Sequence, residues 1–397
     1  SINILGVGTS DSEGIKKGAI VDIDLTVKSI RQAVENAERM VGVPIDQVFA
    51  GISGNHIKLQ PSQGVVAVSS PDREIGEEDI IRVIEASKVV AIPPEREIID
   101  VVPKQFIVDG LSDITDPRGM IGVRLEMEGT IITGSKTIIH NLVRCIERAG
   151  LSIAGIFLQP LAASTLALSK DEMQMGCALI DIGGGQTNIS IFENGSLVDA
   201  FVIPIGGEYI TNDIAIGLKT SSDIAEKIKI KHGCALIDQA VKEEVFTVPR
   251  IGSNLHKEFN QVDLAHIIEP RLEEMLEIIH QEIIRAGYHS IPGGYVLIGG
   301  VSATQGIVEL AREVLQNSVR ISAPDYLGVR EPQYTTGVGI IKYASKHARR
   351  HLHQDEAVSL PNNQRNQAKR MKSEQGMMAV GRYSVKERVK NWLKEFI

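Results

Sequence analysis

Along most of the chain, short apolar runs alternate with longer segments in which apolar residues recur every three or four positions. The short runs are typical of buried strands, and the longer segments are typical of helices with one apolar face. This alternation predicts an α/β protein whose helices pack on sheets. In the first part of the chain it predicts strands at residues 2–8, 19–23 and 48–52, and helices from Asp24 or Thr26 to Val41 and at 136–149.

Residues 57–133 have a different texture, because several short strand-like runs surround a single helical segment. The runs cover residues 64–69, 98–102, 105–108 and 123–127, and the helix covers 77–89. This pattern predicts a small α+β subdomain that is inserted into the first α/β part.

From residue 177 onward, strands and helices alternate again. The predicted strands are 178–182, 187–192, 196–203 and 294–298, and the predicted helices are 211–218, 222–231, 263–286 and 305–315. A second small insert is predicted between residues 235 and 261. Residues 347–380 are mostly polar, with few large apolar side chains, and this composition predicts a flexible linker.

The last fifteen residues regain helical periodicity. An apolar stripe with neighbouring lysines is formed by Val385, Lys386, Val389, Lys390, Trp392, Leu393, Phe396 and Ile397. As a helix this stripe is about 20 Å long, which is too short to span a bilayer but suits a helix lying in its surface. The alternative is a helix that packs on the protein itself or in a partner's groove. The sequence contains no apolar run of membrane-spanning length, and no secretion signal is expected.

The charge distribution supports a surface role for this tail. The net charge of the chain is −8, yet residues 346–397 hold 12 Lys or Arg and 5 Asp or Glu, which leaves +7 there and −15 in the rest. The acidic body disfavours nucleic acid as a partner, whereas the basic tail favours an anionic one. The three cysteines, Cys145, Cys177 and Cys234, form no CxxC pair and are expected to be buried thiols in a reducing compartment rather than metal ligands.

The segment with the clearest chemistry is a strand-like run, residues 179–182, followed by Gly183, Gly184 and Gly185, then Gln186, Thr187 and a second strand. Glycines let the backbone approach a phosphate and direct several N–H donors at it. Asp181 stands at the end of the first strand, where it is suited to hold a hydrated Mg²⁺ that bridges phosphate oxygens. The pattern predicts a phosphate-binding loop, and the alternative is a glycine-rich hairpin without a ligand.

A second glycine pair, Gly299 and Gly300, ends the strand at 296–298 and precedes Ser302. Such a turn brings backbone against a flat base or a ribose, although a simple strand-to-helix turn has the same sequence pattern. Between the two glycine motifs, Glu226 and Lys229 are spaced i, i+3 on a predicted helix and project from the same side. They are candidates for the ribose hydroxyls and the base edge, and the alternative is a solvated ion pair.

This order of motifs resembles the actin-like ATPase superfamily, and within it the sequence is similar to the bacterial cell-division family FtsA of the Gram-positive type. The matching segments are residues 14–22, 132–134, 159–162, 181–187, 206–207, 225–229, 299–300 and 336–339. The resemblance covers essentially the whole chain, including the C-terminal helix.

The resemblance implies a two-lobed actin-like (ribonuclease H-like) α/β fold with Mg–ATP in the cleft. The implied parts are residues 1–56 and 134–176 (first lobe), 57–133 (inserted SHS2 subdomain), 177–227 and 281–346 (second lobe), 228–280 (its small subdomain), 347–382 (disordered linker) and 383–397 (amphipathic helix). It adds Gly206 and Gly207 to the nucleotide site. Gln159 is a candidate for orienting a water in at most slow ATP hydrolysis, or else it caps a loop.

The resemblance also implies a role in the cell cycle. Members polymerise, bind the C-terminal tail of the tubulin-like protein FtsZ, and tether the division ring to the cytoplasmic face of the membrane at the septum, where later divisome proteins join. The tail would dock on residues 228–280, where Arg250, Lys257 and Arg271 are basic.

One departure from the family concerns the N-terminus. The family begins with a strand, a first phosphate hairpin and another strand, whereas Ser1 falls after that hairpin. Residues 6–10 resemble the hairpin superficially, but no Asp precedes them at the right place. Half of the phosphate clamp and two strands are therefore expected to be missing from this sequence.

Two other functions fit the same superfamily. A sugar kinase or phosphatase is one, but a kinase needs a base beside the substrate hydroxyl, and no second acidic motif suits that task. A rod-shape actin homologue of the MreB type is the other, and the insert and the C-terminal helix disfavour it.

Overall fold

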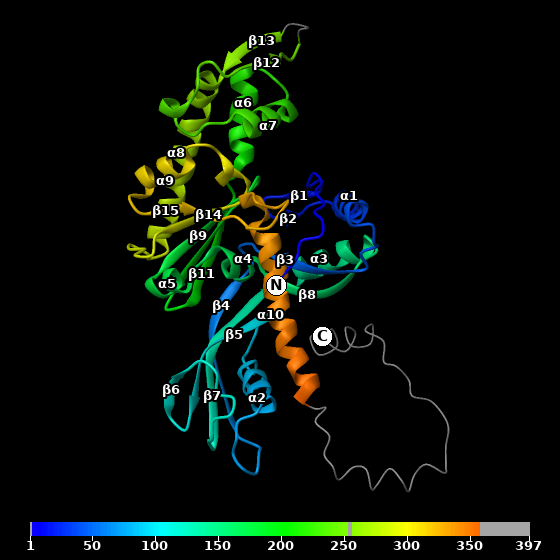
Figure 1. Ribbon diagram of the computed structural model, residues 1–397, viewed down its shortest axis with the longest axis vertical. Coiled ribbons are helices and arrows are strands. Elements are labelled where there is room, and N and C mark those ends of the chain that lie inside the picture. Colours follow the sequence, from blue (N-terminus) through cyan, green and yellow to red (C-terminus); the bar gives the residue numbers. More distant parts are fainter. Residues whose placement is uncertain (1, 253–255, 358–397) are drawn as a thin grey trace, which may run out of the picture. The chain divides into compact units, whose positions relative to one another are not determined.

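The computed structural model describes residues 2–252 and 256–357 (Figure 1). Its chain forms two compact units. The first comprises residues up to 61, 93–104 and 130–342, and the second comprises 62–92, 105–129 and the chain from 343 onward.

A five-stranded sheet forms the centre of the first unit. Its strand order is β11 (Ser196–Ile203), β10 (Thr187–Glu193), β9 (Cys177–Ile182), β14 (Tyr295–Ile298) and β15 (Val319–Ile321). The first three strands form an antiparallel meander, and β14 runs parallel to both β9 and β15. The strands predicted at 178–182, 187–192, 196–203 and 294–298 are thus confirmed to within a residue.

Side-chain alternation along β9 and β10 gives the sheet two different faces. Ile180, Ile182, Ile189 and Ile191 point into a large apolar core that also contains residues of the neighbouring helices. These helices are α6 (Gly207–Leu218), α7 (Ser222–His232), α8 (Gln261–Arg285) and α9 (Ile307–Leu315). Because successive side chains of a strand point to opposite faces, Asp181, Asn188 and Ser190 lie on the other face.

Helix α9 begins two residues later than its pattern predicts. Residues Gly300–Ala303 form a short 3-10 helix, η2, and Gly306 then adopts a left-handed conformation with φ of 80°. A further hairpin, β12 (Val245–Pro249) and β13 (His256–Asn260), precedes α8 and corresponds to the predicted second insert. The short helix η1 (Ile237–Gln239) lies before this hairpin.

The N-terminal part of the first unit contains the hairpin β1 (Ile15–Lys16) and β2 (Ala19–Ile20), helix α1 (Ile23–Val41), and the parallel pair β3 (Gln47–Ile52) and β8 (Ser152–Leu158). Helices α3 (Lys136–Arg148), α4 (Gln159–Ala167) and α5 (Lys170–Met175) complete it. Helix α1 is capped by Asp22, whose Oδ1 accepts a hydrogen bond from Leu25 N at 2.9 Å, rather than by Asp24 or Thr26.

The strand predicted at residues 2–8 is wrong. This segment has no regular secondary structure and lies along α1, where Val7 N donates to Met40 Sδ at 3.4 Å and Asn36 Nδ2 donates to Thr9 O at 2.7 Å. Gly8 approaches the backbone of Ala33 so closely that a Cβ would not fit. The segment contacts a helix instead of a neighbouring strand, and the pattern of apolar residues along the chain does not reveal this.

The inserted region contains helix α2 (Glu77–Ser87) and a sheet in the order β4 (Lys58–Ala67), β7 (Arg124–Ser135), β5 (Arg96–Val108) and β6 (Leu111–Ile114). Strand β5 is continuous, whereas two strands were predicted on either side of Pro103. Pairing of β5 with β6 begins only at Phe106, so the missing N–H of Pro103 removes no hydrogen bond from that ladder.

Helix α10 (Thr335–Ala357) differs from the predicted boundaries, because it continues through the first eleven residues of the linker predicted at 347–382. That stretch is polar, but it contains no Gly or Pro, and polarity alone does not end a helix. The rest of the predicted linker and the amphipathic helix at 383–397 lie outside the described residues. Within residues 2–252 and 256–357, no helix has the length and apolarity needed to cross a membrane. The three cysteines are buried free thiols, as expected.

Candidate functional site

The loop of three glycines connects β9 to β10 as a tight hairpin. Gly183 N donates to Gln186 O at 3.0 Å, and Asp181 stands directly opposite Asn188 in the strand register. Thr187, which was predicted to bind phosphate, is buried and donates its hydroxyl to Ile205 O at 2.8 Å. Its side chain therefore holds the exit of the loop in place.

The N-terminus of α6 supports this loop from behind. Gly207 N donates to Gly183 O at 2.9 Å, and Glu208 N donates to Gly184 O at 2.8 Å. A Cβ on Gly206 would lie only 2.6 Å from Gly183 O, so only glycine permits this approach. Gly206 and Gly207, which the family resemblance adds to the site, thus shape the loop through its carbonyl groups.

The opposite side of the loop is open. In the described part of the chain, the N–H groups of Gly184 and Gly185 have no acceptor, and a Cβ on Gly184 would meet no atom within 4 Å. Free N–H donors on a glycine loop beside empty space are suited to an anion. The loop therefore fits the phosphates of a nucleotide.

Asp181 is enclosed beside this loop. Thr336 Oγ1, at the start of α10, donates to Asp181 Oδ2 at 3.2 Å, and Gly299 packs against the other carboxylate oxygen. Burial raises the pKa of Asp181, and the hydrogen bond from Thr336 partly offsets this by lowering it. An enclosed carboxylate with a single hydroxyl donor gains from a cation, so its surroundings fit Mg²⁺.

Gln159, the first residue of α4, lies on the same side of the sheet. Its Nε2 donates to Gly51 O at 3.3 Å, and its side chain lines a small cavity together with Asp181. Asn188, Ser190 and Thr336 line this cavity too, although the sequence motifs assign them no role. The signal was present, because Asn188 and Ser190 are the polar positions of a strand whose alternate positions are isoleucines.

The second glycine turn, at Gly299 and Gly300, contains one residue with a strained backbone and one residue with open space beside it. Gly299 has a φ of 89°, and a Cβ there would lie 2.5 Å from both Asp181 Oδ1 and Ile182 O. Gly300 is exposed, with open space beside it. Ser302 is fully buried and donates its hydroxyl to Ile298 O at 2.7 Å, so its hydroxyl is already used within the turn.

Glu226 and Lys229 do meet each other, with Lys229 Nζ 2.6 Å from Glu226 Oε2. Lys229 also donates to Thr211 Oγ1 at 2.8 Å and to Gly207 O at 3.1 Å, and it thereby links α7 to the start of α6. The Lys229 side chain is 13% exposed, whereas that of Glu226 is 43% exposed. Of the two, Glu226 is the more accessible to a ligand.

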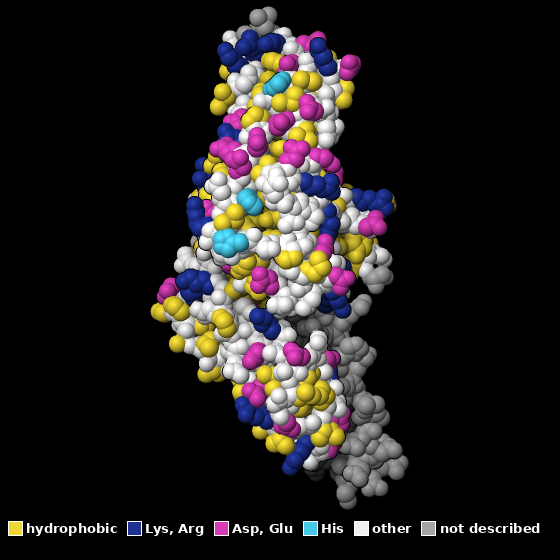
Figure 2. Space-filling model, turned by 90° about the vertical axis from the view of Figure 1, so that its left-hand side faces the viewer, with side chains coloured by type: hydrophobic (Ala, Val, Ile, Leu, Met, Phe, Trp, Pro, Cys, Tyr) yellow, Lys and Arg dark blue, Asp and Glu magenta, His cyan; other side chains and the backbone are white. Residues whose placement is uncertain are grey.

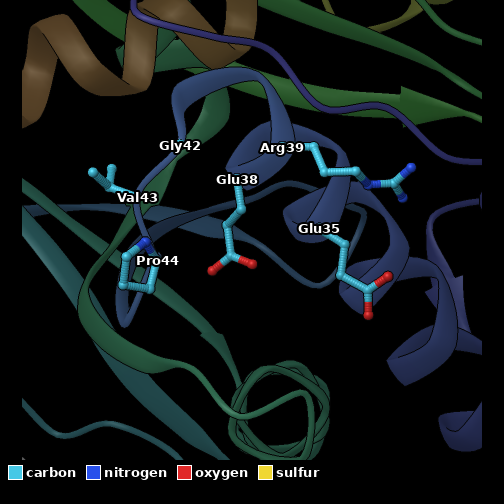
Figure 3. A pocket seen from close by; sticks show the side chains of 6 residues that line it. All are labelled: Glu35, Glu38, Arg39, Gly42, Val43 and Pro44. Carbon is cyan, nitrogen blue, oxygen red and sulfur yellow. The ribbon is translucent and has the colours of Figure 1, made fainter.

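In two other hollows, acidic side chains outnumber basic ones. One lies at the end of α1 and is lined by Glu35, Glu38, Arg39 and residues 42–44 (Figure 3), and Glu38 Oε1 already accepts a hydrogen bond from Ile45 N at 2.7 Å. The other lies between α8 and α9 and contains Glu273, Glu277 and Glu313. Carboxylates repel phosphates, so neither hollow competes with the glycine loops as a nucleotide site.

Comparison with known families matches two segments of the chain. The model of the family described as "Cell division protein FtsA" matches residues 178–339, and that described as "SHS2 domain inserted in FTSA" matches residues 54–133. The cell division protein FtsA of Bacillus subtilis is 57% identical over 349 residues, which are 88% of this chain and 79% of that protein. FtsA of Pseudomonas aeruginosa is 40% identical over 348 residues, covering 86% and 83% of the two chains.

Among solved structures, a chain of the "PilM-PilN type IV pilus biogenesis complex" is similar in fold. Its TM-score is 0.55 at 15% sequence identity, and the match covers 83% of this chain and 88% of that one. At this identity the likeness concerns the fold alone.

Proposed function

Because the chain belongs to the FtsA family of cell division proteins, we propose that it is a nucleotide-dependent scaffold that polymerises and tethers the FtsZ ring to the membrane at the septum. Family membership makes it an actin-like protein of the division machinery. It is therefore expected to bind other proteins of that machinery and to associate with itself. The proposal has three specific parts, which are binding of a nucleotide, binding of the FtsZ tail and binding to the membrane.

The observation that carries the nucleotide proposal is the glycine loop, with the unpaired N–H groups of Gly184 and Gly185 beside the enclosed Asp181. Residues 183–187 would hold the phosphates of ATP, and Asp181 would hold Mg²⁺ through water. The ion would neutralise phosphate charge. Gly299, Gly300 and Glu226 would surround the adenosine, with Lys229 and Ser302 keeping the surrounding backbone in place.

The cavity beside Asp181 also supports at most slow hydrolysis. Gln159 and Asn188 offer amide groups that can orient a water, but neither can take a proton from it. The one carboxylate among the described residues that line this cavity, Asp181, is assigned to the ion, so it is not free to act as the general base that rapid turnover needs.

The membrane proposal rests on the sequence of residues 383–397, which lie outside the described structure. Each basic residue near an anionic surface contributes about 1 kcal/mol, and each large apolar side chain that is buried contributes up to about 1.5–3 kcal/mol. Ordering the helix offsets much of this, so a single tail should bind weakly. A polymer that displays many tails should bind far more tightly.

We expect the fluorescence of Trp392, the only tryptophan of the chain, to shift to the blue when the protein meets anionic vesicles. Trp392→Glu, or deletion from Tyr383 onward, should leave the protein in the supernatant when vesicles are sedimented. Vesicles of neutral lipid are the control, because they remove the electrostatic contribution. An unshifted spectrum at saturating anionic lipid, with protein-free vesicles, would refute membrane binding by the tail.

The FtsZ proposal concerns the end of the small subdomain formed by β12 and β13. Lys257 on β13 is exposed and its ammonium lies over the Phe259 ring at 4.6 Å, and Arg250 follows β12. Figure 2 shows Lys and Arg side chains gathered at this end, at the top of the view. Arg271, which was included with them, is instead ion-paired with Asp213 and Glu274, so it is not available to an acidic peptide.

Reversing both charges, by Arg250→Glu with Lys257→Glu, should weaken binding of an acidic FtsZ tail peptide by about tenfold, and the remaining affinity should depend less on salt. Fluorescence anisotropy of a labelled peptide at two salt concentrations measures both effects. Arg285→Glu, at the far end of α8, is the matched control. If the double reversal binds as the unchanged protein does, these two residues do not contact the peptide, although docking elsewhere on the subdomain would remain.

A further inference from the structure

The hairpin formed by β1 and β2 touches the glycine loop with its tip. The tip residues are Lys17 and Gly18, and a Cβ on Gly18 would lie 2.7 Å from Gln186 Cδ. A Cβ on Gly185 would lie 3.6 Å from Lys17 N. We propose that Lys17 is a phosphate-binding residue, which pairs with the terminal phosphates of a nucleotide held by Gly184 and Gly185; this inference rests on the proposed nucleotide function.

The backbone of Lys17 is unusual for a lysine. Lys17 and Gly18 are the two loop residues of the hairpin, with φ of 48° and 74°, which is the arrangement of a type I′ turn. Such turns favour Asn-Gly or Gly-Gly, because side chains with a Cβ disfavour positive φ. Lys17 is exposed, so packing does not explain why this side chain occupies a strained position. The strained conformation alone does not indicate a ligand, because Lys219 shares it at the end of α6; for Lys17, the position beside the glycine loop points to a ligand contact.

The charges around the tip are also consistent with an anionic ligand. In residues 2–252 and 256–357, neither Lys16 nor Lys17 has an ion-pair partner, and neither is engaged in a side-chain hydrogen bond. Two carboxylates adjoin the loop, those of Asp181 and Glu208, and a Cβ on Gly185 would lie 3.6 Å from Glu208 Oε1. A triphosphate placed between these carboxylates would require added cations, and Lys17 would supply one in addition to Mg²⁺.

The position of the tip determines which part of the nucleotide it meets. Lys17 and Gly18 adjoin Gly185 and Gln186, whereas Gly300 belongs to the turn after β14, on the other side of β9 in the sheet. The adenosine is assigned to Gly300. Lys17 is therefore on the phosphate side of the ligand, and its contribution should grow with the number of phosphates.

Titrations of the full chain with ATP, ADP and AMP test this assignment. Lys17→Asn removes the charge and suits the turn, since Asn tolerates positive φ better than Lys does. We expect about a tenfold or greater loss of ATP affinity, because a hydrogen bond between charged groups is lost, with little change for AMP. Lys17→Arg should retain most of the ATP affinity. Lys219→Asn is the matched control, since Lys219 is also an exposed lysine with a φ of 56°, at the C-terminal end of α6.

The outcomes separate this assignment from the nucleotide site itself. If Lys17→Asn binds ATP as the unchanged protein does, while a carboxylate at Gly184 abolishes binding, the role of Lys17 is refuted and the site stands. If Lys17→Asn weakens ATP and AMP equally, the variant has distorted the loop, and the phosphate contact is again refuted. If neither the unchanged chain nor a chain extended at its N-terminus by the family's first phosphate hairpin binds any of the three nucleotides, both proposals fail together.

Discussion

Gly184→Asp should abolish nucleotide binding while leaving the protein folded. A side chain at this position enters open space, so the fold has no reason to change. The new carboxylate would stand against the phosphates, and two unit charges about 4 Å apart repel by about 4 kcal/mol at an effective dielectric constant near 20. We therefore expect at least a hundredfold loss of ATP affinity in a calorimetric titration, with an unchanged circular dichroism spectrum and melting temperature.

Gly184→Asn is the control for this variant, because it adds a side chain of nearly the same size without the charge. It should lose much less affinity than the aspartate. Equal losses of ATP affinity in the two variants would indicate that the size of the side chain, and not its charge, causes the loss. Undiminished ATP binding by Gly184→Asp would refute the assignment of the phosphates to this loop.

The second large effect concerns stability. Gly299→Ala should lower the free energy of unfolding of the first unit by about 2–5 kcal/mol, because alanine must adopt a positive φ and its Cβ must displace the backbone of β9. The same Cβ would press on Asp181 Oδ1, so the variant should also perturb the nucleotide site. Denaturant unfolding followed by far-UV circular dichroism measures the loss.

Gly300→Ala is a neighbouring change with the opposite expectation. Its Cβ would meet no atom within 4 Å, and its backbone does not require glycine, so unfolding should shift by no more than about 0.5 kcal/mol. Nucleotide affinity should nevertheless fall, because the added methyl group enters the space assigned to the adenosine. If both alanine variants were equally destabilised, the close contact of Gly299 with β9 would not exist in solution.

The sequence predicts most of the second lobe because its signals are local. Strands 178–182 and 187–192 are apolar runs, and Gly183 to Gly185 interrupt them as a turn would. Residues 2–8 show the same apolar pattern, yet they pack on α1 instead of forming a strand. Strand formation needs a partner, and a pattern along one segment contains no information about whether a partner exists.

The candidate site was only partly predictable for a related reason. Asp181 and the glycine loop are recognisable from residue type and order. The direction in which a side chain points cannot be recognised in this way. The hydroxyl groups of Ser302 and Thr187 donate hydrogen bonds to backbone carbonyl groups. Thr336 reaches Asp181 across 155 positions of sequence, and Lys17 reaches the loop through the docking of a separate hairpin, so neither contact has a local signature.

The pairing of β3 with β8 has a consequence for the folding rate. Residues 47–52 and 152–158 form a parallel pair, although about a hundred residues separate them, and the entropy of closing so long a loop slows folding. The inserted region shortens this search, because β4 and β7, its first and last strands, are neighbours in one sheet. Once these two strands pair, the chain between β3 and β8 is effectively reduced to the few residues before β4 and helix α3. The insert would then bring β3 and β8 close together before they pair. Mutations that weaken the pairing of β4 with β7 should therefore delay formation of the β3–β8 pair in refolding kinetics.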